Sequence, residues 1–135
     1  MSAARQDLVL LVEDNDIDAM MLERVLGRLR PEVGLLRAED GEVALDVLET
    51  RRPDLIVMDI RMPRMDGREA LERIKGDERL RGIPVVMMST SRNDEDVAFC
   101  YRNHANAYVV KPVDAREGRG KLEELLRFWL DTVEL

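Results

Sequence analysis

Residues able to hold a cation or a phosphoryl group directly follow four short apolar runs of this sequence. They are Glu13 and Asp14 after the first run, Asp59 after the third, Ser89 and Thr90 after the fourth, and Lys111 after the fifth. If the three carboxylates met in one crevice, they would repel one another unless a cation lay between them. Oxygen ligands favour a hard cation, with Mg²⁺ first and Mn²⁺ or Ca²⁺ as alternatives. Lys111 and Ser89 would then offer a charge and a hydroxyl to phosphoryl oxygens.

The elements that must position these residues can be predicted from the apolar pattern. Apolar runs at 8–12, 33–38, 55–58, 85–88 and 107–110 alternate with segments of helical spacing. Continuous apolar runs are typical of strands that are buried on both faces. The repeated alternation predicts an α/β domain with a parallel sheet and helices on both faces. The common solution of this size is the flavodoxin-like, doubly wound sheet of order 2-1-3-4-5 with five helices.

In such a sheet, ligands bind beyond the carboxyl ends of the strands, where the strand order reverses. That point lies between the first and third strands, where the acids fall. A single acid at a strand end could instead be a helix N-cap, as Asp14 or Asp16 could be, but this does not explain the whole set. A calcium loop of the EF-hand type is excluded, because Ala19 and Val25 stand where that loop needs Gly and Glu.

Length and composition fit one globular domain over residues 1–135. The net charge of −7 argues against a nucleic-acid partner and against an anionic membrane surface. One cysteine, Cys100, cannot form an internal disulfide, which fits the cytoplasm. The first residues lack the apolar core of a signal peptide, and the apolar runs are far shorter than the roughly 20 residues that span a bilayer.

Residues 57–67 carry the most specific motif, VMDIRMPRMDG. It resembles the Asp-x-x-Met-Pro-x-Met-Asp-Gly loop of the receiver domains of two-component response regulators. Together with the acidic pair, the hydroxyl and the Lys-Pro step, the resemblance covers residues 7–130. Glu13 stands where Asp is commoner and Ser89 where Thr is commoner. Both changes keep the chemistry, with Glu13 able to reach a metal through water.

The resemblance implies a phosphoacceptor and its metal. Asp59 would take a phosphoryl group from the phosphohistidine of a sensor histidine kinase. Glu13, Asp14, Asp59 and the backbone carbonyl of Arg61 would hold Mg²⁺. Such a protein is not an enzyme in the usual sense, because it catalyses phosphoryl transfer and dephosphorylation only on itself.

The resemblance also implies a switch. Ser89 and Lys111 would contact the phosphoryl group, and the shift of Ser89 would leave space for Tyr108 to turn inward. This would bias a surface made by the fourth helix, the fifth strand and the fifth helix. The peptide bond between Lys111 and Pro112 is expected to be cis, as in similar receivers.

A closer likeness connects the chain to the small response regulators of bacterial phytochromes. It rests on the run STS at 89–91, the acidic patch at 94–96 and the ending FWLDTV at 128–133. It implies a phytochrome-type histidine kinase as the partner. No helix-turn-helix and no basic helix follow the receiver, so the output is expected to pass through an unidentified downstream protein.

The last predicted helix carries an apolar stripe at i, i+3, i+4, i+7, i+8 and i+11, made of Leu122, Leu125, Leu126, Trp129, Leu130 and Val133. Phe128 lies away from this stripe and would be exposed in a monomer. We therefore expect a homodimer through this helix and the tail, residues 115–135, with Phe128 and Trp129 as contacts.

Two readings from other classes compete with a signalling module. A phosphatase of the haloacid dehalogenase type would also use Asp59 as a nucleophile, but it wants a second Asp where Arg61 stands. A flavodoxin-like cofactor binder wants a phosphate-cradling loop after the first strand, where residues 13–16 would repel a phosphate.

Overall fold

The computed structural model describes residues 7–112 and 114–132, which form one five-stranded parallel sheet with helices on both faces. The strands are β1 (Leu8–Val12), β2 (Gly34–Ala38), β3 (Leu55–Met58), β4 (Val85–Ser89) and β5 (Ala107–Val110). They pair in the order β2-β1-β3-β4-β5, which confirms the predicted order. The predicted and observed strand bounds differ by at most one residue, at the start of β2 and the end of β4.

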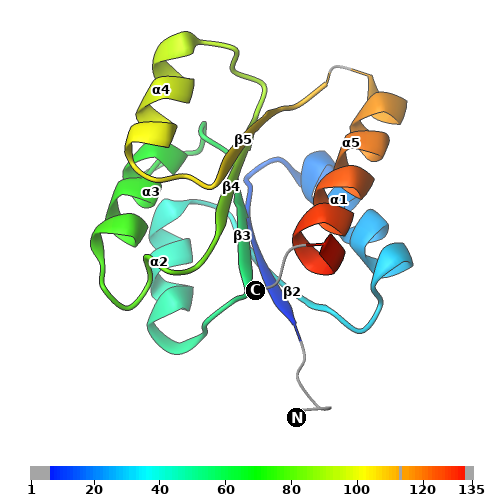
Figure 1. The fold of residues 1–135 in the computed structure, drawn as a ribbon, viewed down its shortest axis with the longest axis horizontal. Coiled ribbons are helices and arrows are strands. Elements are labelled where there is room, and N and C mark those ends of the chain that lie inside the picture. Colours follow the sequence, from blue (N-terminus) through cyan, green and yellow to red (C-terminus); the bar gives the residue numbers. More distant parts are fainter. Residues whose placement is uncertain (1–6, 113, 133–135) are drawn as a thin grey trace.

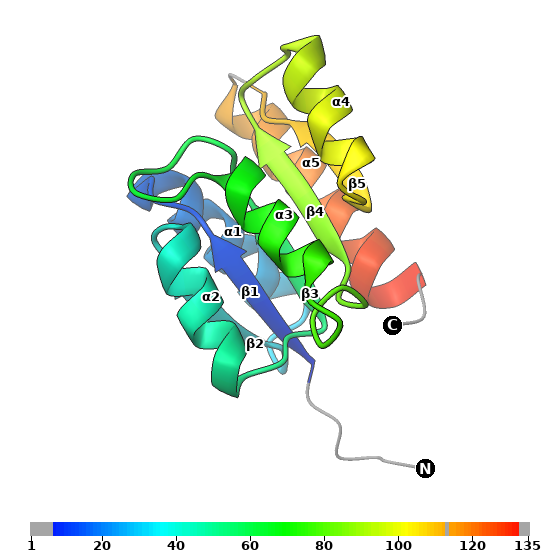
Figure 2. The same ribbon diagram turned by 90° about the vertical axis from the view of Figure 1, so that its left-hand side faces the viewer.

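The helices are α1 (Asp16–Leu29), α2 (Gly41–Thr50), α3 (Gly67–Gly76), α4 (Asp94–Arg102) and α5 (Ala115–Arg127). An Asn or Asp side chain caps the first turn of each, namely Asn15, Asp40, Asp66, Asn93 and Asp114. Such side chains accept hydrogen bonds from backbone N–H groups that the helix leaves unpaired. In Figure 1, α1 and α5 cover one face of the sheet and α2, α3 and α4 the other, and Figure 2 shows the latter three in front.

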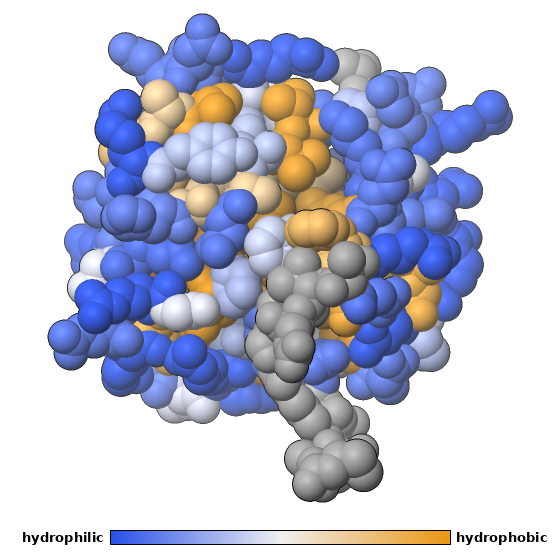
Figure 3. All heavy atoms as spheres, viewed as in Figure 1, coloured by the Kyte–Doolittle hydropathy of each residue, from blue (hydrophilic) through white to orange (hydrophobic). Residues whose placement is uncertain are grey.

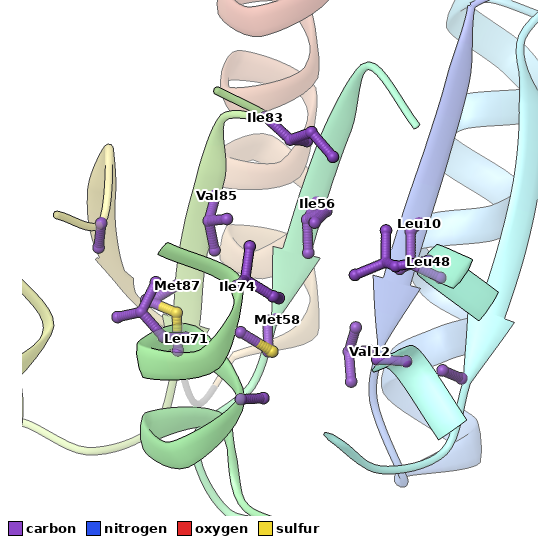
Figure 4. Close-up of a cluster of buried hydrophobic side chains, with 14 of the residues drawn as sticks. Leu10, Val12, Leu48, Ile56, Met58, Leu71, Ile74, Ile83, Val85 and Met87 are labelled. Carbon is purple, nitrogen blue, oxygen red and sulfur yellow. The ribbon is translucent and has the colours of Figure 1, made fainter. Parts of the chain in front are cut away.

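Two apolar cores lie on the two faces of the sheet. Successive residues of β1 point to opposite sides, so Leu10 and Val12 pack under α2 and α3 while Val9 and Leu11 pack under α1 and α5. Figure 4 shows the first of these cores, where side chains of β1, β3 and β4 meet those of α2 and α3. The central strands are thus buried on both faces, which gives the residues at their ends a rigid base.

The C-terminal end of α5 continues into a π-helical turn, Phe128–Thr132. Leu130 is buried in the core under α1 and α5, and Trp129 is half-buried beside it. Arg30, at the end of α1, pairs with Asp131 and so ties the turn to α1. Phe128 is 50% exposed, as predicted. Residues 133–135, the last part of the predicted dimerisation element at 115–135, lie outside the described residues.

Among residues 7–112 and 114–132, no helix combines the length and the apolar character needed to cross a bilayer.

Candidate functional site

Three carboxylates meet at the carboxyl edge of the sheet. β1 pairs with β3 so that Val12 lies beside Met58, and the Asp59 amide donates to the Val12 carbonyl at 3.0 Å. Glu13, Asp14 and Asp59 therefore leave adjacent strand ends, with one oxygen of each within 4.8 Å of the others. Glu13 is buried and Asp14 is exposed. This donor set consists only of oxygen and fits a hard divalent cation.

Helix capping does not account for Asp14. The N-cap of α1 is Asn15, whose Oδ1 accepts from the Asp18 amide at 2.9 Å. Glu13 Oε2 in turn accepts from the Asn15 amide at 3.2 Å. The cap thus fixes the turn that carries the acids, and it leaves the Asp14 carboxylate outside the helix.

Lys111 places its ammonium group among the acids. Its backbone amide donates to the Ser89 carbonyl at 2.7 Å, which continues the pairing of β4 with β5. Its Nζ donates to Glu13 Oε1 at 2.5 Å, to Asp18 Oδ2 at 2.9 Å and to Asp59 Oδ2 at 3.0 Å. Burial acts to lower the pKa of Lys111, but the bonds to Asp18 and Glu13 and the charge of Asp59 raise it overall. Lys111 is therefore a fixed cation.

Asp18 is a site residue that the sequence analysis did not single out for this role. It lies in the first turn of α1, and its carboxylate is the third anion on the Lys111 ammonium. An acid in the first turn of the helix after β1 must lie close to the carboxyl edge of the sheet. That position was the available signal, although Asp18 does not itself follow a strand directly.

Arg37, which the sequence analysis also missed, supports the acidic turn from β2. Its Nε donates to the Glu13 carbonyl at 3.0 Å, and its Nη1 pairs with Asp16 Oδ1 at 2.9 Å. Its Nη2 is buried and has no hydrogen-bond partner in the part of the chain that the structure describes. The available signal was its place at the carboxyl end of the strand beside β1.

Burial raises the pKa of Glu13 to about 7; the hydrogen bond from Lys111 opposes this rise, and the charge of Asp59 adds to it. The ordinary value is 4.5. In the metal-free protein, Glu13 therefore still carries a proton in part of the molecules near neutral pH. A cation at this site would have to displace that proton.

We expect the metal-free protein to lose stability as the pH rises from about 4.5 to about 7. In this window folded Glu13 holds a proton that unfolded Glu13 has released, so the free energy of unfolding falls, by roughly 3 kcal/mol over the window. Urea unfolding of the wild type and of Glu13→Gln across this range measures the effect. The variant should lack this part of the pH slope, and identical slopes in the two proteins would contradict the assignment.

Both residues that the resemblance assigns to the switch contact Ser91. Ser89 is fully buried, and its Oγ accepts from the Ser91 amide at 3.2 Å. The Tyr108 hydroxyl donates to the Ser91 carbonyl at 2.9 Å. Burial raises the pKa of Tyr108, so its hydroxyl stays protonated. Ser91 is thus a shared partner that the sequence analysis did not assign to the switch.

The expected cis bond between Lys111 and Pro112 is wrong for this structure, since no peptide bond among the described residues is cis. The trans form of a bond before proline is favoured by about 0.5–1 kcal/mol, so trans is the ordinary outcome.

A cleft of about 230 Å³ opens beside Lys111 on the side of α1 and α5. Glu13, Asp18, Asp59 and Thr90 line its polar end together with Lys111, and apolar side chains of β1, β3, α1 and α5 line the rest. Of the two hydroxyl residues that follow the fourth apolar run, Thr90 therefore faces this cleft, while Ser89 bonds to the loop behind it.

Similar proteins share this architecture. The family model of the response regulator receiver domain matches residues 9–123. The chain is 39% identical over 129 residues to the probable methanogenesis regulatory protein FilR2 of Methanothrix harundinacea, which covers 91% of this chain and 83% of FilR2. It is 35% identical over 135 residues to the response regulator Rcp1 of Synechocystis, which covers 95% of this chain and 92% of Rcp1.

Two crystal structures resemble the structure of this chain over nearly its whole length. The phosphorylated cyanobacterial phytochrome response regulator RcpA has a TM-score of 0.94 at 33% identity, covering 97% of this chain and 99% of RcpA. The Mn²⁺-bound form of Rcp1 has a TM-score of 0.92 at 34% identity, covering 96% of this chain and 98% of Rcp1. The phosphatase-like and flavodoxin-like alternatives are therefore not favoured. The chain belongs to the response regulator receiver family of two-component systems and is related to the phytochrome response regulators Rcp1 and RcpA.

Proposed function

We propose that Asp59 accepts a phosphoryl group from the phosphohistidine of a sensor histidine kinase, with Mg²⁺ held by Glu13, Asp14 and Asp59. One observation carries the proposal. The Lys111 ammonium, on a side chain that is only 11% exposed, lies 3.0 Å from Asp59 Oδ2 in the same crevice as the two other acids. A cation and a lysine on one carboxylate suit the positioning and charge neutralisation that phosphoryl transfer needs.

In this reaction an oxygen of ionised Asp59 attacks phosphorus, the bond to the histidine nitrogen breaks, and its electron pair stays on the imidazole. Asp59 Oδ1 accepts from the Ile60 amide at 2.7 Å, which fixes the plane of the carboxylate. Bound Mg²⁺, with the Arg61 carbonyl among its ligands, would neutralise phosphate charge. Lys111 would offset the charge of the acids. The chain thus catalyses transfer and dephosphorylation on itself and is not an enzyme with an external substrate.

The switch that we propose uses Ser89, Ser91 and Tyr108. A phosphoryl group on Asp59 would draw the Ser89 hydroxyl toward it, and this shift would weaken the bond that Ser89 Oγ accepts from the Ser91 amide. The loop would then be free to shift, and with it the Ser91 carbonyl that holds Tyr108. Tyr108 lies on β5, the edge strand between α4 and α5. Figure 3 shows apolar side chains between these helices, framed by hydrophilic ones, and this face would meet the downstream partner.

We propose a phytochrome-type kinase as the phosphate donor, working in the cytoplasm. The likeness to Rcp1 and RcpA supports the first part, and a buried free thiol at Cys100 is consistent with a reducing compartment. FilR2, a probable methanogenesis regulatory protein, is also similar to this chain. The kinase that donates the phosphoryl group must therefore be tested directly.

The test is phosphotransfer profiling against a panel of autophosphorylated histidine kinases, phytochrome-type ones included. We expect Mg²⁺-dependent labelling, fastest from the phytochrome-type donor, and none after chelation of the metal. Faster labelling by kinases of another type would contradict the phytochrome part alone. Failure with every kinase and with a small-molecule phosphodonor would contradict the phosphoacceptor role.

We also propose a homodimer through α5 and the segment after it. Phe128 is half exposed and meets the Trp129 ring edge-on, with centroids 5.4 Å apart, on the turn anchored by Arg30. Two copies could bury these rings against each other, and aromatic anchors of this kind dominate the energy of interfaces.

Phe128→Ala is expected to weaken the dimer by at least about tenfold, because the ring supplies buried aromatic area. Analytical ultracentrifugation over a concentration series measures this. Met20→Ala is the control, since Met20 is an apolar side chain of similar exposure, 49%, on α1. An unchanged dissociation constant of the dimer in Phe128→Ala would show that Phe128 does not contribute to the interface.

A further inference from the structure

Arg64 adopts a backbone conformation that residues other than glycine rarely adopt. It lies in the loop between β3 and α3, and its φ is +62°. Glycine would fit this position without strain, and asparagine tolerates it better than other side chains do. An arginine here therefore needs a compensating contact.

That contact is Asp40, which is fully buried at the start of α2. Asp40 Oδ1 caps α2 by accepting from the Val43 amide at 3.0 Å. Asp40 Oδ2 accepts from Arg64 Nε at 2.8 Å and also from Arg64 Nη2. The guanidinium thus bonds through two nitrogens to the one oxygen that the cap does not use. Such charge-assisted bonds are directional, and Asp40 is fully buried, although water partly screens the Arg64 side chain, which is 60% exposed.

The neighbouring residues add a second contact between the same two segments. The Gly41 amide donates to the Met65 carbonyl at 2.9 Å. A Cβ on Gly41 would lie 2.8 Å from that carbonyl oxygen, so only glycine allows this approach. The N-cap and the first residue of α2 therefore hold the tip of the β3–α3 loop at two successive positions.

The base of the loop is closed separately. The Gly67 amide donates to the Ile60 carbonyl at 2.7 Å, and a Cβ on Gly67 would come within 2.0 Å of the Asp59 carbonyl oxygen. The stretch between Asp59 and Gly67, which includes Arg61, is thus pinned at its base by Gly67 and at its tip by Asp40.

We propose that the ion pair of Asp40 with Arg64 is a latch that positions the β3–α3 loop for cation binding beside Asp59. The inference rests on the proposed function only for what the cation does, because the latch itself exists in the metal-free protein. Asp40 and Arg64 are positioning residues. They act through the loop backbone, and neither belongs to the acidic cluster of Glu13, Asp14 and Asp59.

The test uses Arg64→Asn and Asp40→Asn. Asn at 64 tolerates the backbone and removes the charge, while Asn at 40 keeps a capping oxygen but puts an amide nitrogen before Arg64. Mn²⁺ binding, measured by electron paramagnetic resonance without any phosphodonor, should weaken about tenfold in each variant. Amide hydrogen exchange of residues 60–66 in the metal-free variants should be faster than in the wild type. The double variant should be no weaker than either single variant, because both remove one interaction.

Arg73→Ala is the control, because it removes an arginine that pairs with Glu69 on the exposed face of α3. It should change neither readout. Wild-type Mn²⁺ affinity and wild-type exchange in both latch variants would overturn the proposal, and so would additive losses in the double variant. If the wild type itself bound no Mn²⁺, the proposed function would fail, and hydrogen exchange in the metal-free protein would still decide whether the latch holds the loop.

Discussion

Asp59→Asn is expected to abolish Mg²⁺-dependent phosphorylation of this protein, a loss of more than about a thousandfold in rate. The amide is nearly isosteric with the carboxylate, so Oδ1 can keep the bond from the Ile60 amide. The nitrogen that replaces Oδ2 carries no negative charge, cannot attack phosphorus and cannot accept from Lys111. The fold is therefore retained while the nucleophile and one anion of the metal site are lost.

Intact-mass spectrometry after incubation with a small-molecule phosphodonor and Mg²⁺ measures this effect. Asp66→Asn is the matched control in the same loop. Asp66 caps α3 by accepting from the Glu69 amide at 3.0 Å, and Asn caps helices equally well. The control should be labelled at the wild-type rate. Labelling of Asp59→Asn at that same rate would show that Asp59 is not the phosphoacceptor.

The parts of the fold that could be predicted are those set by local pattern. The three central strands are buried on both faces, so their runs are continuously apolar and easy to recognise. The strand order came from the commonest topology for such a chain, and the site followed from the rule that ligands bind at the carboxyl edge. Glu13, Asp14, Asp59 and Lys111 follow strands directly, so the sheet alone brings them together.

The missed contacts depend on where long side chains reach. Lys111 and Asp18 are 93 residues apart, and Arg64 and Asp40 are 24 apart, so neither pair has a local signal. The apolar stripe could not predict the π-helical turn at Phe128–Thr132 either, because its spacing of 100° per residue assumes a regular α-helix. The expected cis bond at Pro112 came from resemblance alone and had no support in this chain's own residues.

Loss of the positive charge of Lys111 should lower both the stability of the protein and its rate of phosphorylation. The Lys111 side chain is 11% exposed, and its partners Glu13 and Asp59 are 4% and 12% exposed. Lys111→Met keeps much of the volume but leaves these carboxylates without their counter-charge. Removing one partner of a buried ion pair typically costs about 3–5 kcal/mol. We expect a loss of that size in the free energy of unfolding of the metal-free protein at pH about 8, together with a roughly hundredfold slower phosphorylation.

Added Mg²⁺ should stabilise Lys111→Met more than the wild type, because in the variant the metal replaces the counter-charge that Lys111 gives to the acids. The loss should also shrink at lower pH, where the unpaired carboxylates can take up protons. Lys121→Met is the control. Lys121, on α5, donates through its Nζ to the carbonyl of Val110 at 3.0 Å, next to Lys111, and losing this bond should cost only about 1 kcal/mol. Urea unfolding with and without Mg²⁺, at pH about 8 and at lower pH, measures these effects on stability. If Lys111→Met were as stable as Lys121→Met without metal, the acids around Asp59 would not depend on Lys111 for their neutralisation.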